Sequence, residues 1–220
     1  MSKITSLIDK QDTFEIIRDK IAAIIFTESA QQVALATTAG KPRPADWAVR
    51  VYTERSFPWD DYAGNELLAN VWFSSAVPDP RASGTVQEQT MIGTFNIDVI
   101  GFANSRANGA GHISGDEAAA RVAARGVKLV RNMIMAGQYT YLDLRPIVGQ
   151  RMPQQIEAFQ PQFNTNAFEQ AVGFRLALEV RYSEFSPQFE PDILDELSVT
   201  LQRAEDGHIY AVLEYDFTNP

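Results

Sequence analysis

Few residues in this 220-residue sequence have the chemistry of a catalytic or metal-binding group. There are two histidines and no cysteine, and each histidine, His112 and His208, follows a glycine in an expected loop or turn. Neither has a second histidine at the spacing that metal sites use. The phosphate-binding glycine motifs and the G-x-S-x-G nucleophile elbow do not occur either. The sequence therefore predicts no cofactor and no histidine-based metal centre.

Clusters of carboxylates are the remaining candidates for metal chemistry. Asp60 and Asp61 are adjacent, and three further acids stand between positions 192 and 196. Either group offers the hard oxygen ligands that calcium prefers, although the spacing of a dedicated calcium loop is missing. The ordinary interpretation is a solvated surface or, for the second cluster, the start of a helix. A metal-dependent hydrolase that uses Asp60, Asp61 or Asp98 stays open as an alternative.

Two other groups of residues suit binding better than catalysis. Trp59 and Tyr62 flank the acidic pair in an expected loop, and these aromatic types are enriched where proteins bury surface against partners. Trp59 folding back over a sheet edge is the equal alternative. Arg121, Arg125 and Lys128 form a basic row at helical spacing. Such a row suits nucleic acid or an acidic partner, but it is more often the solvated outer face of a helix.

Composition sets the broad class of the protein. A hydrophobic content of 45% and a charged content of 21% indicate a folded chain with a true core. The formal net charge of −9 repels phosphate, which disfavours a protein that reads DNA. The same charge suits a conduit through which DNA slides without being held. The apolar runs are too short to cross a bilayer and no signal pattern opens the chain, so a cytosolic setting is predicted.

A long strand, a loop and a long helix form the centre of the chain. Period-two alternation predicts the strand over Gln89–Phe102, and Ile100 on its more polar face indicates that this face is also partly covered. The composition of residues 104–113 predicts a mobile connector. An amphipathic helix is expected over residues 115–136, and Ser114 with Glu117 has the pattern of a capping box at its start.

The remaining elements complete an α+β fold. A first helix is expected from Thr13 to Thr27, with an extension to Leu35 that the pattern allows, and two prolines make residues 40–46 irregular. Further strands are expected at Trp47–Arg55, Leu67–Ser74 and Ala171–Phe185. The segments Tyr139–Leu144 and Arg151–Phe159 are ambiguous, and the second of them allows a strand. A hairpin is expected over residues 197–217, with its turn at residues 204–207. The prediction is one domain, residues 1–220, with an N-terminal arm over residues 1–11. Its sheet is mixed and mainly antiparallel, with two long helices packed on one face and a C-terminal β-hairpin.

Nine segments, spread over nearly the whole chain, carry a resemblance to a known family. They are Trp47–Tyr52, the acidic aromatic loop after it, Asn70–Phe73, Thr94–Asp98, Gly115–Ala119, Val127–Asn132, Met135–Leu142, Phe159–Gln162 and Leu176–Val180. In this order they resemble the small neck or tail-completion proteins of tailed phages, most closely tail-terminator proteins. The resemblance is one of segment order and contains no catalytic signature.

The resemblance implies a structural protein of the virion, located in the tail or neck and in the host cytoplasm during assembly, and not an enzyme. Proteins of this kind are similar to ring-forming caps. About six copies stack on the last ring of the tail tube, stop its growth and present a surface to the head–tail connector protein. The implied partners are therefore the chain itself, the tail tube protein and the connector, with DNA passing through the lumen without specific binding and with no membrane involved.

A cyclic ring needs two different patches on each subunit. The predicted patches are the loops Phe57–Glu66 and Asn104–Ile113, and the start of the basic row is a further candidate. The candidate interface residues are Trp59, Asp60, Asp61, Tyr62, Arg106, Asn108, His112, Arg121 and Arg125. A head-side connector or adaptor is the alternative within the same class. Outside it, the alternatives are the acidic-site enzyme and a monomeric module that recruits a host protein through Trp59 and Tyr62.

Overall fold

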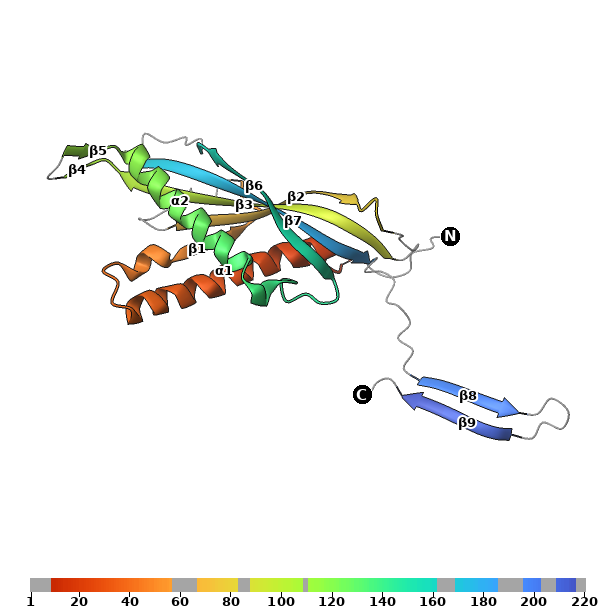
Figure 1. Cartoon of the computed structure of the whole chain (residues 1–220). Coiled ribbons are helices and arrows are strands. Elements are labelled where there is room, and N and C mark those ends of the chain that lie inside the picture. The colour runs from red at the N-terminus through yellow and green to blue at the C-terminus, as the bar shows by residue number, and fades with distance from the viewer. Residues whose placement is uncertain are drawn as a thin grey trace. The chain divides into compact units, whose positions relative to one another are not determined.

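The structure is a computed structural model that describes residues 9–56, 67–82, 88–108, 111–161, 169–185, 196–202 and 209–216 (Figure 1). Its contacts divide the chain into two compact units. The larger unit is Lys10–Phe185, and the smaller one combines Met1–Asp9 with Ser186–Pro220. Each unit is described by itself.

A five-stranded sheet forms the body of the larger unit (Figure 1). Its strands, in spatial order, are β1 (Val49–Thr53), β2 (Leu67–Pro78), β3 (Glu88–Asn104), β7 (Glu169–Phe185) and β6 (Val148–Phe159). The β1–β2 pair is parallel and the other three pairs are antiparallel. The predicted α+β fold with a mixed, mainly antiparallel sheet is therefore confirmed.

The first helix, α1 (Thr13–Thr38), is the longer of the two α-helices in the described residues. It begins with a capping box, in which the backbone N–H of Asp12 donates to the Glu15 carboxylate at 3.0 Å. It continues past Thr27 and ends just before Gly40, whose φ of +63° favours glycine. Its buried side chains include Ile17, Ile21, Ile24 and Ile25, which recur at helical spacing along one face.

The second helix, α2 (Gly115–Ile134), packs on β3 and β7, on the same face of the sheet as α1. Ala119, Ala123, Val127, Val130 and Ile134 are all buried, as their spacing predicts. The approach is close because β3 presents Gly101 to the helix backbone. A Cβ built on Gly101 would lie 2.5 Å from the backbone nitrogen of Ala123. The side chain of Arg151 in β6 then donates to the carbonyls of Ile134 and Ala136, each at 2.7 Å, and so ties the end of α2 to the sheet.

Local predictions were wrong at three places. Residues 40–46 were expected to be irregular, yet Pro44–Trp47 forms a 3₁₀ turn, η1, with proline at its start. The expected connector after β3 contains a short hairpin of β4 (Arg106–Asn108) and β5 (Gly111–Ile113). The capping box of α2 is not formed: the side chain of Ser114 makes no cap hydrogen bond, and Glu117 pairs with Arg121 instead. A second 3₁₀ turn, η2 (Gly137–Tyr139), follows α2.

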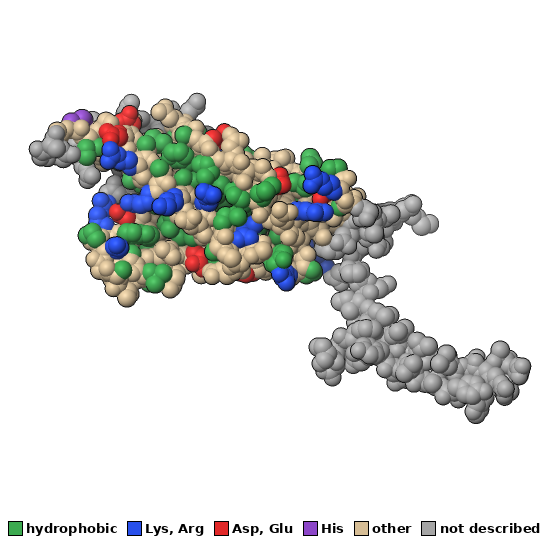
Figure 2. Space-filling model, viewed as in Figure 1, with side chains coloured by type: hydrophobic (Ala, Val, Ile, Leu, Met, Phe, Trp, Pro, Cys, Tyr) green, Lys and Arg blue, Asp and Glu red, His purple; other side chains and the backbone are tan. Residues whose placement is uncertain are grey.

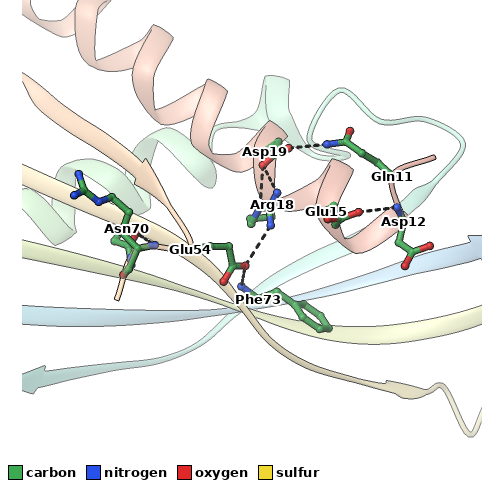
Figure 3. A network of polar contacts seen from close by, with 9 residues as sticks. Gln11, Asp12, Glu15, Arg18, Asp19, Glu54, Asn70 and Phe73 are labelled. Carbon is green, nitrogen blue, oxygen red and sulfur yellow. Dashed lines mark hydrogen bonds and ion pairs between the residues drawn. The ribbon is translucent and has the colours of Figure 1, made fainter. Parts of the chain in front are cut away.

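A polar network fastens α1 to the end of β1 (Figure 3). Glu54 follows β1 with a positive φ of 53° and accepts a hydrogen bond from the backbone N–H of Phe73 at 2.9 Å. Arg18 of α1 forms an ion pair with the same carboxylate at 3.5 Å and a shorter one, 2.8 Å, with Asp19. The carboxamide of Asn70 bonds both backbone groups of Arg55. These contacts fix the chain that leaves β1 against β2.

In the smaller unit, β8 (Glu196–Gln202) pairs antiparallel with β9 (Ile209–Asp216). The register sets Leu197 opposite Tyr215 and Val199 opposite Leu213. The predicted turn, residues 204–207, lies outside the described residues, as does most of the predicted N-terminal arm.

Candidate functional site

The structure brings part of the predicted interface together at one end of the sheet. Arg106 and Asn108 belong to β4 and His112 to β5, where His112 is exposed and pairs in register with Ala107. This hairpin directly precedes α2, which carries Arg121 and Arg125. The other four predicted residues, Trp59, Asp60, Asp61 and Tyr62, lie outside the described residues.

A cleft of about 350 Å³ lies between the start of α2, η1 and the end of β3. Arg121 and Arg125 line it together with Arg43 and Asp46 of the η1 region, and with Ile113 at the end of β5. Asp46 accepts from Arg125 at 3.1 Å and pairs with Arg43 at 3.0 Å, so one carboxylate serves two cations. The cleft therefore keeps an excess of positive charge.

The basic row continues beyond this cleft along α2. Lys128 and Arg131 are exposed, and among the described residues neither forms an ion pair. Figure 2 shows Lys and Arg side chains in a row across the face that carries α2, with hydrophobic side chains beside them. This local concentration of positive charge contrasts with the formal net charge of −9 for the whole chain.

The face of the sheet opposite the helices holds a polar cluster that sequence reasoning missed. Arg175 of β7 lies directly across from Asp98 of β3. It donates to both oxygens of that carboxylate, at 2.7 and 3.0 Å. The indole N–H of Trp72 donates to Asp98 at 3.0 Å. The guanidinium also lies 4.9 Å from the ring centroid of Trp72 and 5.4 Å from that of Phe159.

Electrostatics within this cluster favour the charged pair. The hydrogen bonds to Asp98 raise the pKa of Arg175 above its usual value, against the opposing effect of burial. Since both oxygens of Asp98 already accept hydrogen bonds from Arg175, this carboxylate is engaged in an ion pair, which leaves it poorly suited to the metal-ligand role of the enzyme alternative. A cavity of about 320 Å³ opens over the cluster and is also lined by Glu54, Arg55 and Asn70.

The available sequence signal for this cluster was weak. Asp98 and Arg175 each fall on the non-core face of an alternating strand, which is where an exposed charge would also be placed. Their pairing depends on the β3–β7 register, which period-two alternation alone does not supply. Leu68, Ile100 and Phe102 are also buried on this face. The prediction that the more polar face of the long strand is partly covered is therefore confirmed.

Both edges of the sheet lack a partner strand within the described residues. β1 lies at one edge and β6 at the other. β6 exposes two large apolar side chains, Met152 at 42% and Ile156 at 43%. Ile156 pairs in register with Leu176, whose side chain belongs to the helix-covered core, yet Ile156 itself is exposed, whereas Val148 at the start of β6 is buried in that core. β1 has 5 residues and pairs in parallel, whereas β6 has 12 residues and pairs antiparallel, so the two edges present different surfaces.

Comparison with protein-family models and with curated proteins found no match. Among the described residues, no group of three or more His, Cys, Asp or Glu side chains is arranged to hold a metal ion. Over the same part of the chain, neither α-helix combines the length and apolar character that crossing a membrane requires.

Proposed function

We propose that this chain is a structural protein of a phage virion that assembles into a ring, caps the tail tube at the head–tail junction and ends tube growth. The observation that carries the proposal is that, within the described part of the chain, the sheet ends in two unlike strands, β1 and β6, neither of which has a second partner strand. Unpaired strand edges are normally covered, and two unlike edges can meet head to tail. Such a heterologous contact closes into a ring when its rotation is right.

Two further features support this function. Strands β3 and β7 run for 17 residues each, about three times the usual strand length, and offer a long rigid frame for repeated contacts. The order of sequence segments resembles tail-completion proteins across the same strands and helices. The head-side connector remains the second candidate within this class, because open edges serve either ring.

Size-exclusion chromatography with light scattering on the full chain, followed by electron microscopy, tests the proposal. We expect a ring of about six copies that binds the ends of isolated tail tubes and blocks addition of tube protein. The matched variants are Ile156→Lys on the β6 edge and Val77→Lys, which is 57% exposed on β2. The first is expected to weaken assembly and the second is not. A chain that stays monomeric at every concentration and leaves tube growth unchanged would refute the proposal.

A further inference from the structure

A groove of about 480 Å³ lies beside the edge strand β1, between that strand and α1. Ala22, Ala23 and Phe26 of α1 form one wall, and residues 51–53 with Arg55 form the other. Phe26 is 66% exposed, although α1 buries its opposite side in the core. A helix that is apolar on two sides usually packs on both of them. The groove therefore combines the two features that take up an added strand, an outer strand edge and an apolar helix wall.

Hydrogen bonds of β1 show which of its residues direct their backbone to the groove. The N–H of Val49 donates to the hydroxyl of Ser29 in α1 at 2.8 Å, and so points away from β2. The N–H of Glu54, an odd number of positions further on, donates instead to the carbonyl of Val71 in β2 at 3.0 Å. Since alternate residues of a strand direct their backbone groups to the same side, the N–H and C=O of Val51 also point away from β2. Its side chain packs on the helix-covered core.

The same reasoning applies to β6, the strand at the other edge. The N–H of Ser183 in β7 donates to the carbonyl of Ile147, just before β6. Leu176 lies an odd number of positions earlier in β7, which runs without a bulge against β3, so its backbone groups point away from β6. Ile156 is opposite Leu176, and its own N–H and C=O therefore point outward from the sheet. Its side chain lies on the helix-covered face and is 43% exposed.

We infer that β6 of a second copy docks in this groove as an added strand, antiparallel to β1, with Ile156 opposite Val51 and beside Phe26. The inference rests on the proposed ring and specifies its subunit contact. Within one sheet β1 and β6 run in opposite directions, so a head-to-tail contact that keeps the helices on one face makes an antiparallel pair (Figure 1). Val51 and Ile156 then form a hydrogen-bonded pair, and α1 of the neighbouring copy covers the exposed part of Ile156.

Charge on the other face of the same strands selects this register. With Val51 opposite Ile156, Arg50 of β1 lies opposite Glu157 of β6, and both are on the face away from the helices. Arg50 is exposed, and the side chain of Glu157 is 48% exposed. Opposite charges that face each other across two strands stabilise the pairing. A shift of two residues in either direction would lose this pair and place an uncharged residue opposite Arg50.

Cysteine cross-linking tests the register, and the background is clean because the chain contains no cysteine. Arg50→Cys with Glu157→Cys in one chain should link neighbouring copies under mild oxidation, seen as a ladder on non-reducing gels. Within one copy the two positions lie at opposite edges of a five-stranded sheet, roughly 19 Å apart, which a disulfide does not span. The control pairs Arg50→Cys with Ile156→Cys, which strand alternation places on opposite faces. The control should give no more cross-linking than the single-cysteine variants.

Phe26→Lys tests the helix wall of the groove. Because Phe26 is largely exposed in one copy, the variant should fold, which circular dichroism verifies. We expect the concentration for half-assembly, measured by analytical ultracentrifugation of the full chain, to rise by roughly tenfold, because the apolar cover of Ile156 is lost. The matched control is Leu35→Lys, which is 50% exposed on the same helix outside the groove and should assemble normally.

The outcomes separate this contact from the proposed ring. Wild-type rings without a ladder from Arg50→Cys with Glu157→Cys, or with an equal ladder from the control pair, would overturn the inference and leave the ring standing. Equal assembly of Phe26→Lys and Leu35→Lys would do the same. Rings that persist in Phe26→Lys while binding of tube protein is lost would assign the groove to a segment of the tube protein, which also overturns the inference. A wild type that forms no ring refutes both proposals.

Discussion

Removing the Asp98–Arg175 ion pair should destabilise the larger unit, and a double-mutant cycle can measure how much. The single variants are Asp98→Asn and Arg175→Met, which keep the side-chain volume while removing one charge each. With charge centres about 4 Å apart and an effective dielectric constant of about 20, the attraction is of order 4 kcal/mol. The Arg175 side chain is 32% exposed and the Asp98 side chain is 13% exposed, so water screens part of this attraction. We therefore expect a coupling free energy of about 2 kcal/mol.

Each single variant removes the close partner of the charge that remains, so the two single substitutions should together lower stability by more than the net contribution of the ion pair. We expect Asp98→Asn to lower the free energy of unfolding by about 3 kcal/mol, because Arg175 then keeps only a longer ion pair with Glu157, at 3.9 Å, and its contacts with the aromatic rings. Urea unfolding followed by tryptophan fluorescence gives all four free energies. The exposed pair Arg121–Glu117 is the matched control, with an expected coupling below about 0.5 kcal/mol. A coupling for Asp98–Arg175 as small as that of the control would refute the reasoning.

Two further predictions concern packing and pH. Gly101→Ala should lower the free energy of unfolding, measured in urea, by about 1–3 kcal/mol, because the added methyl group meets the backbone of α2. The control is Gly137→Ala, where an added Cβ has nothing within 4 Å and should cause no such steric loss. Equal losses of stability in the two variants would contradict the close approach of α2 to β3. Burial is the main cause that raises the pKa of Glu184 above its ordinary 4.5. Its protonated form therefore favours folding, and that contribution is complete below pH 4.5 and lost as the pH rises through the raised pKa. Glu184→Gln should accordingly raise Tm over the wild type more at pH 7 than at pH 4, in thermal scans, and an equal change at both would count against a raised pKa.

Most of the elements were predictable because the periodicity of a helix or strand is a local property. The alternation over Ala171–Phe185 lies within β7, and the alanine and valine spacing of α2 identifies its buried stripe. The errors occur where a distant contact replaces a local one. The backbone N–H of Gly115, at the start of α2, donates to the hydroxyl of Ser105, 2.9 Å away in the segment before β4, while Ser114 provides no cap.

The candidate assembly surfaces also combine features that the sequence alone shows with features that depend on tertiary contacts. The basic row was readable because Arg121 and Arg125 are one helical turn apart, whereas the shared carboxylate of Asp46 comes from a 3₁₀ turn 79 positions away. The unlike edges of the sheet depend on strand order, which places β6 outside β7 although α2 separates β3 from β6 along the chain.

The sequence by itself determined where most of the helices and strands lie, which face of each is apolar and where charge accumulates, since these follow from spacing within one segment. Only the tertiary structure decided that Asp98 faces Arg175, that α2 rests on Gly101 and that Ile156 of β6 is left exposed. The physical reason is that strand pairing and helix docking join segments far apart in the chain. Their choice depends on the packing of the whole core and not on any single periodic pattern.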